Sequence, residues 1–407
     1  MLQSKVNRML KMGPRTASKR RIFFVLGWLG MVIYFTQRWV LGPLIPPLMQ
    51  DFSVNRTTLG IVGSASLWGY MITPIIAGLL SDRFGRKRPV LFGIICFSTF
   101  TVVSGLAMNL GQLFAARFVT GIGEAFFVIS LIAFTIEMFP ERPGFYLTLM
   151  VSGNSLGWFA GPALAGWLFD LTGSWRWPFI CTGIIGLVIC ALLFWFWPEE
   201  KERQSPPGHF FDRTILRRNN LLMLLLLSLT GAFQIATEFG FTMWYPVFLK
   251  TELYLTATTA GVIAGLFGIG QFFGRPIMGL ISDRTGYRLV GIVGSVIQGI
   301  SLILVLSAAT PYSRVLFTLQ AGFFGAAVMG ALLTYTGLIF PSFKGLALGI
   351  IITFGYSTAS FAPIAIGYLG DLYSVSTALW LVCVPTAFLA GAPFFVSYLI
   401  QKNKKDF

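Results

Sequence analysis

Long apolar runs dominate this sequence, and they constrain its fold more than any other feature. A helix needs about 20 mostly apolar residues to cross the hydrocarbon core of a bilayer. The runs of that kind cover residues 22–46, 57–80, 90–108, 112–138, 145–168, 177–197, 220–248, 257–281, 288–307, 315–340, 345–369 and 376–399. Only 11% of the residues are charged, against about 25% in ordinary soluble domains. The sequence therefore predicts an all-α membrane protein with twelve transmembrane helices and no large soluble domain.

The basic residues set the orientation. The net charge is +15, but the Lys and Arg residues cluster near residues 5–21, 83–88, 201–218 and 402–405, with an even number of apolar runs (two, four and six) between successive clusters. All four clusters therefore lie on one side, and the positive-inside rule makes that side cytoplasmic. We predict a multi-pass protein of a prokaryotic cell (inner) membrane, with both termini in the cytoplasm. Because the membrane topology accounts for the positive net charge, we expect the protein to contact the lipid bilayer and not to bind nucleic acid.

Few residues suit metal or covalent chemistry. The four cysteines fall within apolar runs, and the one histidine, His209, lies in a polar Pro/Gly-containing loop. No Gly-x4-Gly-Lys-Ser/Thr loop for binding nucleotide phosphates is present. We therefore expect no metal, no cofactor and no enzymatic activity, and we expect a monomer.

The two halves of the sequence repeat each other at a constant offset of 201 residues. The segment GLLSDRFG at 78–85 reappears as GLISDRTG at 279–286. The same offset relates Asp51 to Glu252, Gly60 to Gly261, Gly121 to Gly322, Pro140 to Pro341, Pro162 to Pro363, Gly166 to Gly367 and Asp170 to Asp371. We predict two pseudo-symmetric six-helix bundles, at 1–197 and 220–407, joined by a cytoplasmic loop at 198–219. Parallel repeats of this kind can rock about a central site.

The segment GLLSDRFGRK at 78–87 resembles the signature of the major facilitator superfamily, and its degenerate copy at 279–288 lies where that family has a second one. The resemblance implies the major facilitator fold and a gating role for the motif. Glycine permits close helix approach at Gly78 and a tight turn at Gly85, and Asp82 can accept bonds from basic groups. A purely topogenic basic loop is the alternative. The predicted gating residues are Gly78, Asp82, Arg83, Gly85, Arg86, Asp283 and Arg284.

Five charged residues fall well inside the apolar runs. A charge at the bilayer centre costs at least about 2.5–3.5 kcal/mol, so each is a functional candidate. They are Arg38, Arg117, Glu124, Glu238 and Arg275. Arg275 lies near the predicted cytoplasmic end of its run, where we expect it to brace the gating segment or to extend toward water.

Residues 117–125, RFVTGIGEA, resemble the fourth span of two branches of the superfamily, the organic-anion/proton symporters and the Spinster-like lipid carriers. This resemblance implies that Glu124 binds the coupled proton and that Arg117 belongs to the same polar network. The two residues lie about 10.5 Å apart along one helix face. An ion pair that only ties helices together is the alternative.

The first span contains Gln37-Arg38, where both branches usually have Asp-Arg. Arg38 keeps its charge and offers a planar fork to a carboxylate or phosphate. The missing acid has a candidate replacement, because the offset carries Gln37 onto Glu238. We predict that Glu238 faces Arg38 across the cavity, with Gln234 bonded to its carboxyl group. Permanent neutralisation of Arg38 by Glu124 or Glu238 is the alternative.

Taken together, these residues predict a proton-coupled symporter of a small organic anion, a carboxylate or sugar acid, that works by alternating access. The predicted substrate-binding residues are Arg38, Arg117, Gln37, Tyr335 and Tyr356, and the predicted proton sites are Glu124 and Glu238. Proton-driven efflux of drugs or amphiphilic lipids is the main alternative. It is favoured by the glycines and Gly161-Pro162 of the fifth span, which are similar to a motif of drug/proton antiporters, although close helix packing also explains them. A non-transporting sensor on the same fold is a second alternative.

Overall fold

The computed structural model describes residues 14–198, 218–340 and 344–403, and within these ranges it contains helices and no strands. The predicted central loop at 198–219 lies almost wholly outside the described residues. The amino-terminal half comprises α2 (Pro14–Trp39), α3 (Leu41–Phe52), α4 (Arg56–Ile72), α5 (Pro74–Phe84), α6 (Lys87–Gly105), α7 (Leu110–Met138), α8 (Pro143–Thr172) and α9 (Arg176–Phe196). The carboxy-terminal half comprises α10 (Arg218–Thr251), α11 (Ala257–Thr285), α12 (Tyr287–Ser307), α13 (Pro311–Ile339), α14 (Lys344–Ala359), α15 (Ala362–Leu372), α16 (Val375–Leu389) and α17 (Ala392–Asn403).

Several of the predicted spans are bent or broken. Within the described residues, ten helical segments are long and apolar enough to cross a membrane, and the pair α4 and α5, bent by 46°, adds an eleventh. The 30-residue α8 completes the twelve predicted spans. The bend at Thr73 precedes Pro74, whose ring removes a backbone donor. The first span is interrupted between α2 and α3, at Val40. This break matters because it lies two residues after Arg38.

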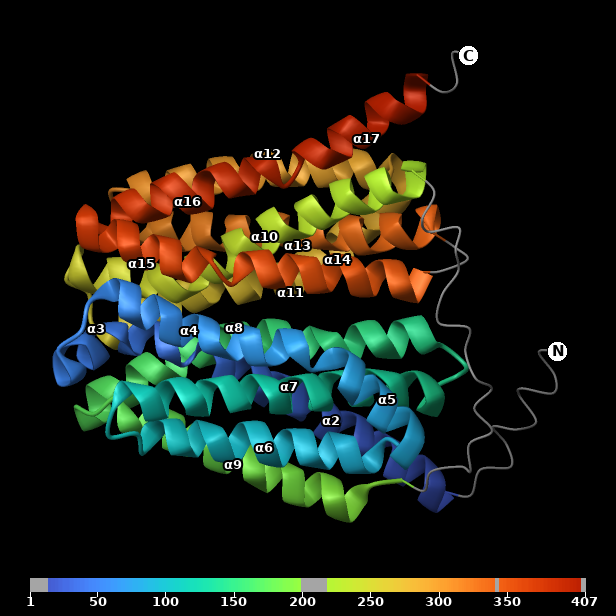
Figure 1. Cartoon of the computed structure of the whole chain (residues 1–407), viewed down its shortest axis with the longest axis horizontal. Coiled ribbons are helices and arrows are strands. Elements are labelled where there is room, and N and C mark those ends of the chain that lie inside the picture. Colours follow the sequence, from blue (N-terminus) through green and yellow to red (C-terminus); the bar gives the residue numbers. More distant parts are fainter. Residues whose placement is uncertain (1–13, 199–217, 341–343, 404–407) are drawn as a thin grey trace.

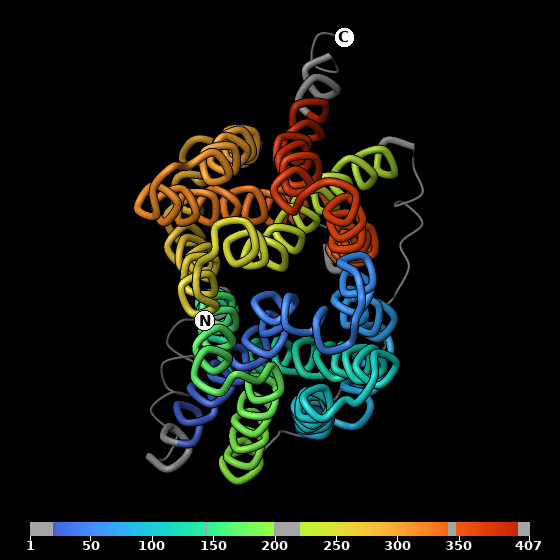
Figure 2. The backbone as a smooth tube through the Cα atoms, turned by 90° about the vertical axis from the view of Figure 1, so that its left-hand side faces the viewer, coloured from blue at the N-terminus to red at the C-terminus, as the bar shows by residue number. Residues whose placement is uncertain are grey.

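The two halves lie side by side with their helices roughly aligned (Figures 1 and 2). The start of α2, the junction of α5 and α6, the start of α10 and the end of α17 lie on one side, here called the terminal side (Figure 1). The end of α3 and the junction of α15 and α16 lie on the opposite side, here called the far side. The basic clusters within the described residues therefore share one side, as the sequence predicts.

The halves meet through two symmetry-related contacts. A Cβ atom at Gly60 of α4 would lie 2.6 Å from the carbonyl oxygen of Pro363 in α15. A Cβ atom at its counterpart Gly261 of α11 would lie 2.1 Å from the carbonyl oxygen of Pro162 in α8. The offset of 201 thus relates whole interfaces, α4 with α15 and α11 with α8. This geometry confirms the predicted pseudo-symmetric bundles.

The far side is the closed side in this conformation. There the carboxylate of Asp371 accepts the backbone N–H groups of Arg56 and Thr57, each at 2.9 Å. At mid-depth, Ser64 donates to the carbonyl of Ser360 at 2.6 Å, and Trp158 donates to Thr242 at 2.7 Å. The two halves are therefore fastened from the far side to the middle of the protein.

Candidate functional site

The centre of the molecule holds a buried ion pair between α2 and α7. The Nε atom of Arg38 donates to Oε2 of Glu124 at 3.0 Å, and Nη2 of Arg38 donates to the same oxygen. Arg38 is 4% exposed and Glu124 is fully buried. Two glycines just before the acid permit the packing, because a Cβ atom at Gly123 would lie 2.6 Å from the backbone nitrogen of Phe97, and one at Gly121 would overlap the carbonyl of Ser66. The sequence thus allows helices to close around Glu124.

In the part of the chain that the structure describes, the ion pair leaves one polar atom of each residue without a hydrogen bond. Within the described residues, Nη1 of Arg38 and Oε1 of Glu124 are buried and have no hydrogen-bond partner. Buried polar atoms without partners are rare and costly in native structures. Arg38 therefore keeps a donor for a further acceptor, and Glu124 keeps an oxygen that can take a proton.

Arg117 of α7 binds two backbone carbonyl groups at the end of α2. Its Nη1 atom donates to the carbonyl oxygen of Gln37 at 3.2 Å, and its Nη2 atom donates to that of Arg38 at 3.3 Å. Carbonyls at a helix end lack intrahelical partners, and a cation there also offsets the helix dipole. In this conformation Arg117 therefore positions Arg38 and does not line the central cavity.

Five aromatic rings surround the guanidinium group of Arg38. The distances from its Cζ atom to the ring centroids range from 5.1 Å for Tyr34 and Tyr70 to 6.0 Å for Tyr356, with Phe35 and Phe239 between them. Such distances allow cation–π attraction. Phe239 and Tyr356 belong to the carboxy-terminal half, so this aromatic cage closes only when the two halves meet.

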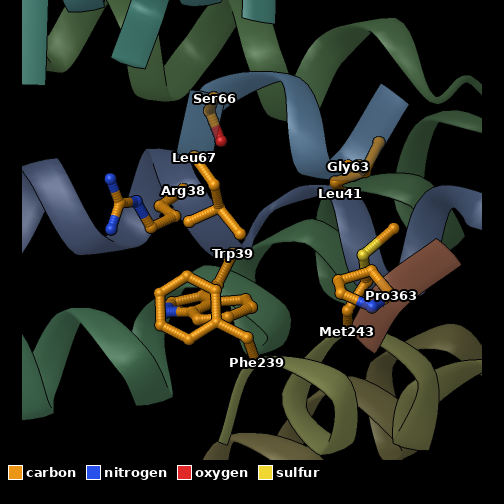
Figure 3. A pocket seen from close by; sticks show the side chains of 10 residues that line it. Arg38, Trp39, Leu41, Gly63, Ser66, Leu67, Phe239, Met243 and Pro363 are labelled. Atoms are coloured by element: carbon orange, nitrogen blue, oxygen red, sulfur yellow. The ribbon is translucent and has the colours of Figure 1, made fainter. Parts of the chain in front are cut away.

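A small cavity adjoins Arg38 between the halves (Figure 3). Figure 3 shows Arg38 and Trp39 of α2 opposite Phe239 and Met243 of α10. The lining residues are Arg38, Trp39, Leu41, Gly42, Gly63, Ser66, Leu67, Phe239, Met243 and Pro363. About 20 Å³ of the cavity is open to the centre of a water molecule, room for one or two waters. A larger ligand requires the cavity to widen.

Glu238 does not pair with Arg38, so that prediction is wrong for this conformation. Its Oε1 atom accepts from Nε2 of Gln234 at 3.0 Å and from Nε2 of Gln271 at 2.9 Å. The bond from Gln234 agrees with the sequence prediction. Gln37, the equivalent position in the first span, bonds instead to Thr101 of α6 and Thr182 of α9, whereas α11 supplies Gln271 to Glu238. Equal sequence offset therefore does not give equal side-chain direction here.

Two other predicted substrate residues lie away from Arg38. The side chain of Gln37 donates to the carbonyl of Thr182 at 2.9 Å and accepts from Thr101 at 2.8 Å, so it packs toward α9 and α6. Tyr335 lies on α13 beside Phe394 and under Arg288. Tyr356 does lie at the site, as part of the aromatic cage. Tyr34, Tyr70 and Phe239 were not predicted, because isolated aromatics in apolar spans carry no distinguishing pattern.

In the gating motif at 78–87, Arg86 makes two ion pairs within the amino-terminal half. Arg86 lies 2.7 Å from Asp82 and 2.9 Å from Glu137. Gly85 has a φ of 81° and its counterpart Gly286 has a φ of 97°, so the predicted turns require glycine. Gly78 departs from the prediction, because a Cβ atom there would meet no atom within 4 Å.

The rest of the predicted gating residues lie at the surface. Asp283 and Arg284 are exposed, and Asp283 accepts a hydrogen bond from Tyr287. Arg83 lies 5.4 Å from the ring centroid of Phe84. Among the described residues, no group of three His, Cys, Asp or Glu side chains is placed to hold a metal ion. The structure therefore brings together Arg38, Glu124, Arg117 and Tyr356, while Asp82 and Arg86 pair elsewhere in the amino-terminal half and Asp283 and Arg284 lie at the surface of the carboxy-terminal half.

The family model described as Major Facilitator Superfamily matches residues 27–256 and 227–406 of this chain. The chain therefore belongs to the Major Facilitator Superfamily, and the predicted fold and family are confirmed. It is a membrane transporter of that family and not an enzyme.

Similar proteins cover most of the chain. A cis,cis-muconate transport protein of Acinetobacter baylyi is 26% identical over 91% of this chain and 94% of its own length. A gentisate transporter of Corynebacterium glutamicum is 26% identical over 86% of this chain and 82% of its own length. A bacterial homologue of the human lysosomal transporter Spinster, in an inward-facing and occupied conformation, has a TM-score of 0.78 at 17% identity, covering 95% of this chain and 97% of its own. That structural similarity concerns the fold alone.

Proposed function

We propose that this protein carries a small organic carboxylate, together with a proton, across the membrane by alternating access. The observation that carries the proposal is the buried pair of Arg38 and Glu124, which leaves one guanidinium nitrogen without a partner. Two similar proteins are named as transporters of muconate and of gentisate, and both compounds are carboxylates. A cationic residue at the centre of the fold suits the same class of substrate.

The pair couples substrate to proton by competition for Arg38. A substrate carboxylate that takes the guanidinium fork displaces Glu124, because both bind the same donors. Glu124 is then a fully buried carboxylate without a cation. An unpaired buried charge is expensive, and protonation removes the cost. Substrate and proton therefore enter the site together, and a neutral Glu124 with a neutralised Arg38 allows the loaded site to close.

The aromatic cage favours a planar, conjugated carboxylate. Tyr70 of the amino-terminal half and Phe239 and Tyr356 of the carboxy-terminal half flank the guanidinium group. Aromatic faces stack on planar π-systems as well as on cations. Because the cage draws on both halves, a ligand held there contacts both bundles and biases their relative position.

The terminal side is proposed to be the cytoplasmic side of a prokaryotic inner membrane, since it carries the basic clusters. The conformation with a closed far side then faces the cytoplasm and corresponds to substrate release. The remaining functional partners are the substrate and the proton, and the working unit is proposed to be a monomer.

The test is uptake into proteoliposomes under an imposed proton gradient. Radiolabelled cis,cis-muconate and gentisate serve as probes, with D-xylose and a cationic dye as compounds of unlike charge. We expect accumulation of at least one carboxylate that a protonophore abolishes, and none of xylose or dye. Proton-driven export of the dye, without carboxylate uptake, would instead establish the efflux alternative.

A further inference from the structure

A second charged network lies in the carboxy-terminal half and consists of Glu238, Gln271 and Arg275. Gln271 donates through Nε2 to Oε1 of Glu238 at 2.9 Å, and accepts through Oε1 from Nη2 of Arg275 at 3.1 Å. An amide has one donating end and one accepting end, so Gln271 connects an acid to a base in a fixed direction. The three residues form an ion pair bridged by one amide.

The network reaches across the interface between the halves. Nη1 of Arg275 donates to the carbonyl oxygen of Val151 in α8 at 3.5 Å, a long contact at the limit of hydrogen bonding. The same two helices also approach closely at Gly268, where an added Cβ atom would lie 2.5 Å from the carbonyl oxygen of Ser155. Arg275 therefore braces α11 against α8, and not against the gating segment as the sequence suggested.

Few other charges act on this acid. Glu238 is 5% exposed and lies on α10. Its charged and titratable neighbours in the described structure are Arg275 on α11 and Tyr356 on α14. Arg38 contacts the ring of the next residue, Phe239, but is already bonded to Glu124. Glu238 is also the carboxylate whose charge acts most strongly on Arg275.

We propose that Glu238, Gln271 and Arg275 form a second proton-responsive coupling element, which links protonation in the carboxy-terminal half to the contact between α11 and α8. The proposal rests on the proposed function and adds a site to it. When Glu238 is ionised, its charge holds Gln271 and offsets Arg275. When Glu238 binds a proton, Arg275 loses its counter-charge inside a membrane span, where an uncompensated cation is costly. Arg275 then moves toward water, and its brace on α8 is released.

The direction of the effect follows from the conformation that contains the brace. The network is intact while the far side is closed, so an ionised Glu238 favours far-side closure and a protonated Glu238 favours far-side opening. By linkage, far-side closure favours release of the proton. A symporter that releases its proton on the terminal side requires that the far side closes before the proton leaves.

The experiment measures far-side opening without substrate. In full-length protein with Cys96, Cys181, Cys190 and Cys383 replaced, Ala257→Cys places one thiol at a position that is 1% exposed when the far side is closed. Its rate of maleimide labelling is divided by that of Tyr312→Cys, an 87% exposed position on the same side. This ratio corrects for the pH dependence of maleimide reaction with an exposed thiol.

All measurements are made in a Glu124→Gln background, so that the central pair does not contribute. We expect the ratio to rise at least about fivefold between about pH 8 and about pH 5. Glu238→Gln and Gln271→Leu should each remove this rise and hold the ratio high at all pH values. Arg275→Gln, at a half-buried position, should do the same and provides a second test if Gln271→Leu does not fold.

Gln298→Leu is the matched control, because Gln298 is a fully buried glutamine on α12 whose amide atoms have no partner in the described structure. This variant should keep the rise. The proposal is overturned if the rise is absent in the Glu124→Gln background or survives Glu238→Gln. Because the assay contains no substrate, failure of the proposed function would appear separately, as absent carboxylate uptake with an intact pH response.

Discussion

Asp371, at the end of α15, caps the helix that begins at Arg56 in the other half of the molecule. Its carboxylate accepts the backbone N–H and the hydroxyl group of Thr57, at 2.9 and 2.6 Å. Asp170 of α8 repeats this contact on Thr258 of α11, with both distances at 2.7 Å. The offset of 201 relates each acid to the other and each threonine to the other. A carboxylate at a helix amino terminus satisfies free donors and the helix dipole. The far side is thus fastened by two equivalent caps.

Removing either cap should open the far side. Replacing a capping residue by alanine costs about 0.5–2 kcal/mol, and here the loss falls on the closed conformation alone. We expect Asp371→Ala and Asp170→Ala each to raise labelling of a cysteine at position 257 by roughly two- to thirtyfold, and the double variant to approach the product. Asn109→Ala is the control, since Asn109 caps α7 within one half. An equal rise in this control would contradict the inter-half role.

Glycine is required at several close contacts between the two halves. A Cβ atom at Gly60 would lie 2.6 Å from the carbonyl oxygen of Pro363, a separation that real Cβ atoms do not show. Gly60→Ala and Gly261→Ala should therefore prevent far-side closure and abolish uptake, while labelling at position 257 becomes fast. Gly330→Ala should leave uptake and labelling unchanged, because a Cβ atom there would meet nothing within 4 Å. Normal uptake by both close-contact variants would show that the backbones separate readily.

The repeat explains which features the sequence could predict. Backbone contacts such as Gly60 with Pro363 follow the offset, because helix packing depends on positions of small residues that both halves share. Side-chain direction near the centre did not follow it. Gln37 faces α6 and α9, where Thr101 and Thr182 are its partners, while Glu238 faces Gln271 on α11. These partners are not repeated between the halves, because the offset carries Thr101 onto Leu302 and Thr182 onto Cys383, so the repeat could not predict them.

The charges show the same limit. A charged residue inside an apolar run identifies itself as a candidate, which is why Arg38 and Glu124 could be found. Its partner depends on helix rotation, and the sequence left Arg38 open to Glu124, Glu238 or substrate. The aromatic cage had no sequence signal, because its five rings come from single turns of four separate helices, α2, α4, α10 and α14.

Arg38→Lys should weaken carboxylate binding while preserving the charge. Lysine presents one ammonium group in place of a planar fork, so it cannot offer the substrate carboxylate two parallel N–H donors. A hydrogen bond to a charged group contributes about 1.5–3 kcal/mol, so loss of one should raise the Kd by roughly tenfold to a hundredfold. Isothermal titration with the carboxylate that proteoliposomes accumulate measures this change. An unchanged Kd would remove Arg38 from the binding site.

Glu124→Gln should separate substrate movement from proton movement. Glutamine resembles the protonated acid in shape but cannot release a proton, so the variant behaves as if permanently loaded at this position. It also frees Arg38 from its carboxylate partner, which should leave carboxylate binding intact or tighter. We expect counterflow exchange of labelled for unlabelled carboxylate to continue, and accumulation driven by a pH gradient to disappear. Glu137→Gln is the control, since Glu137 lies near the end of the same helix and pairs with Arg86. Accumulation at the wild-type level in Glu124→Gln proteoliposomes would show that another residue binds the coupled proton. Glu238 would then be the next residue to test.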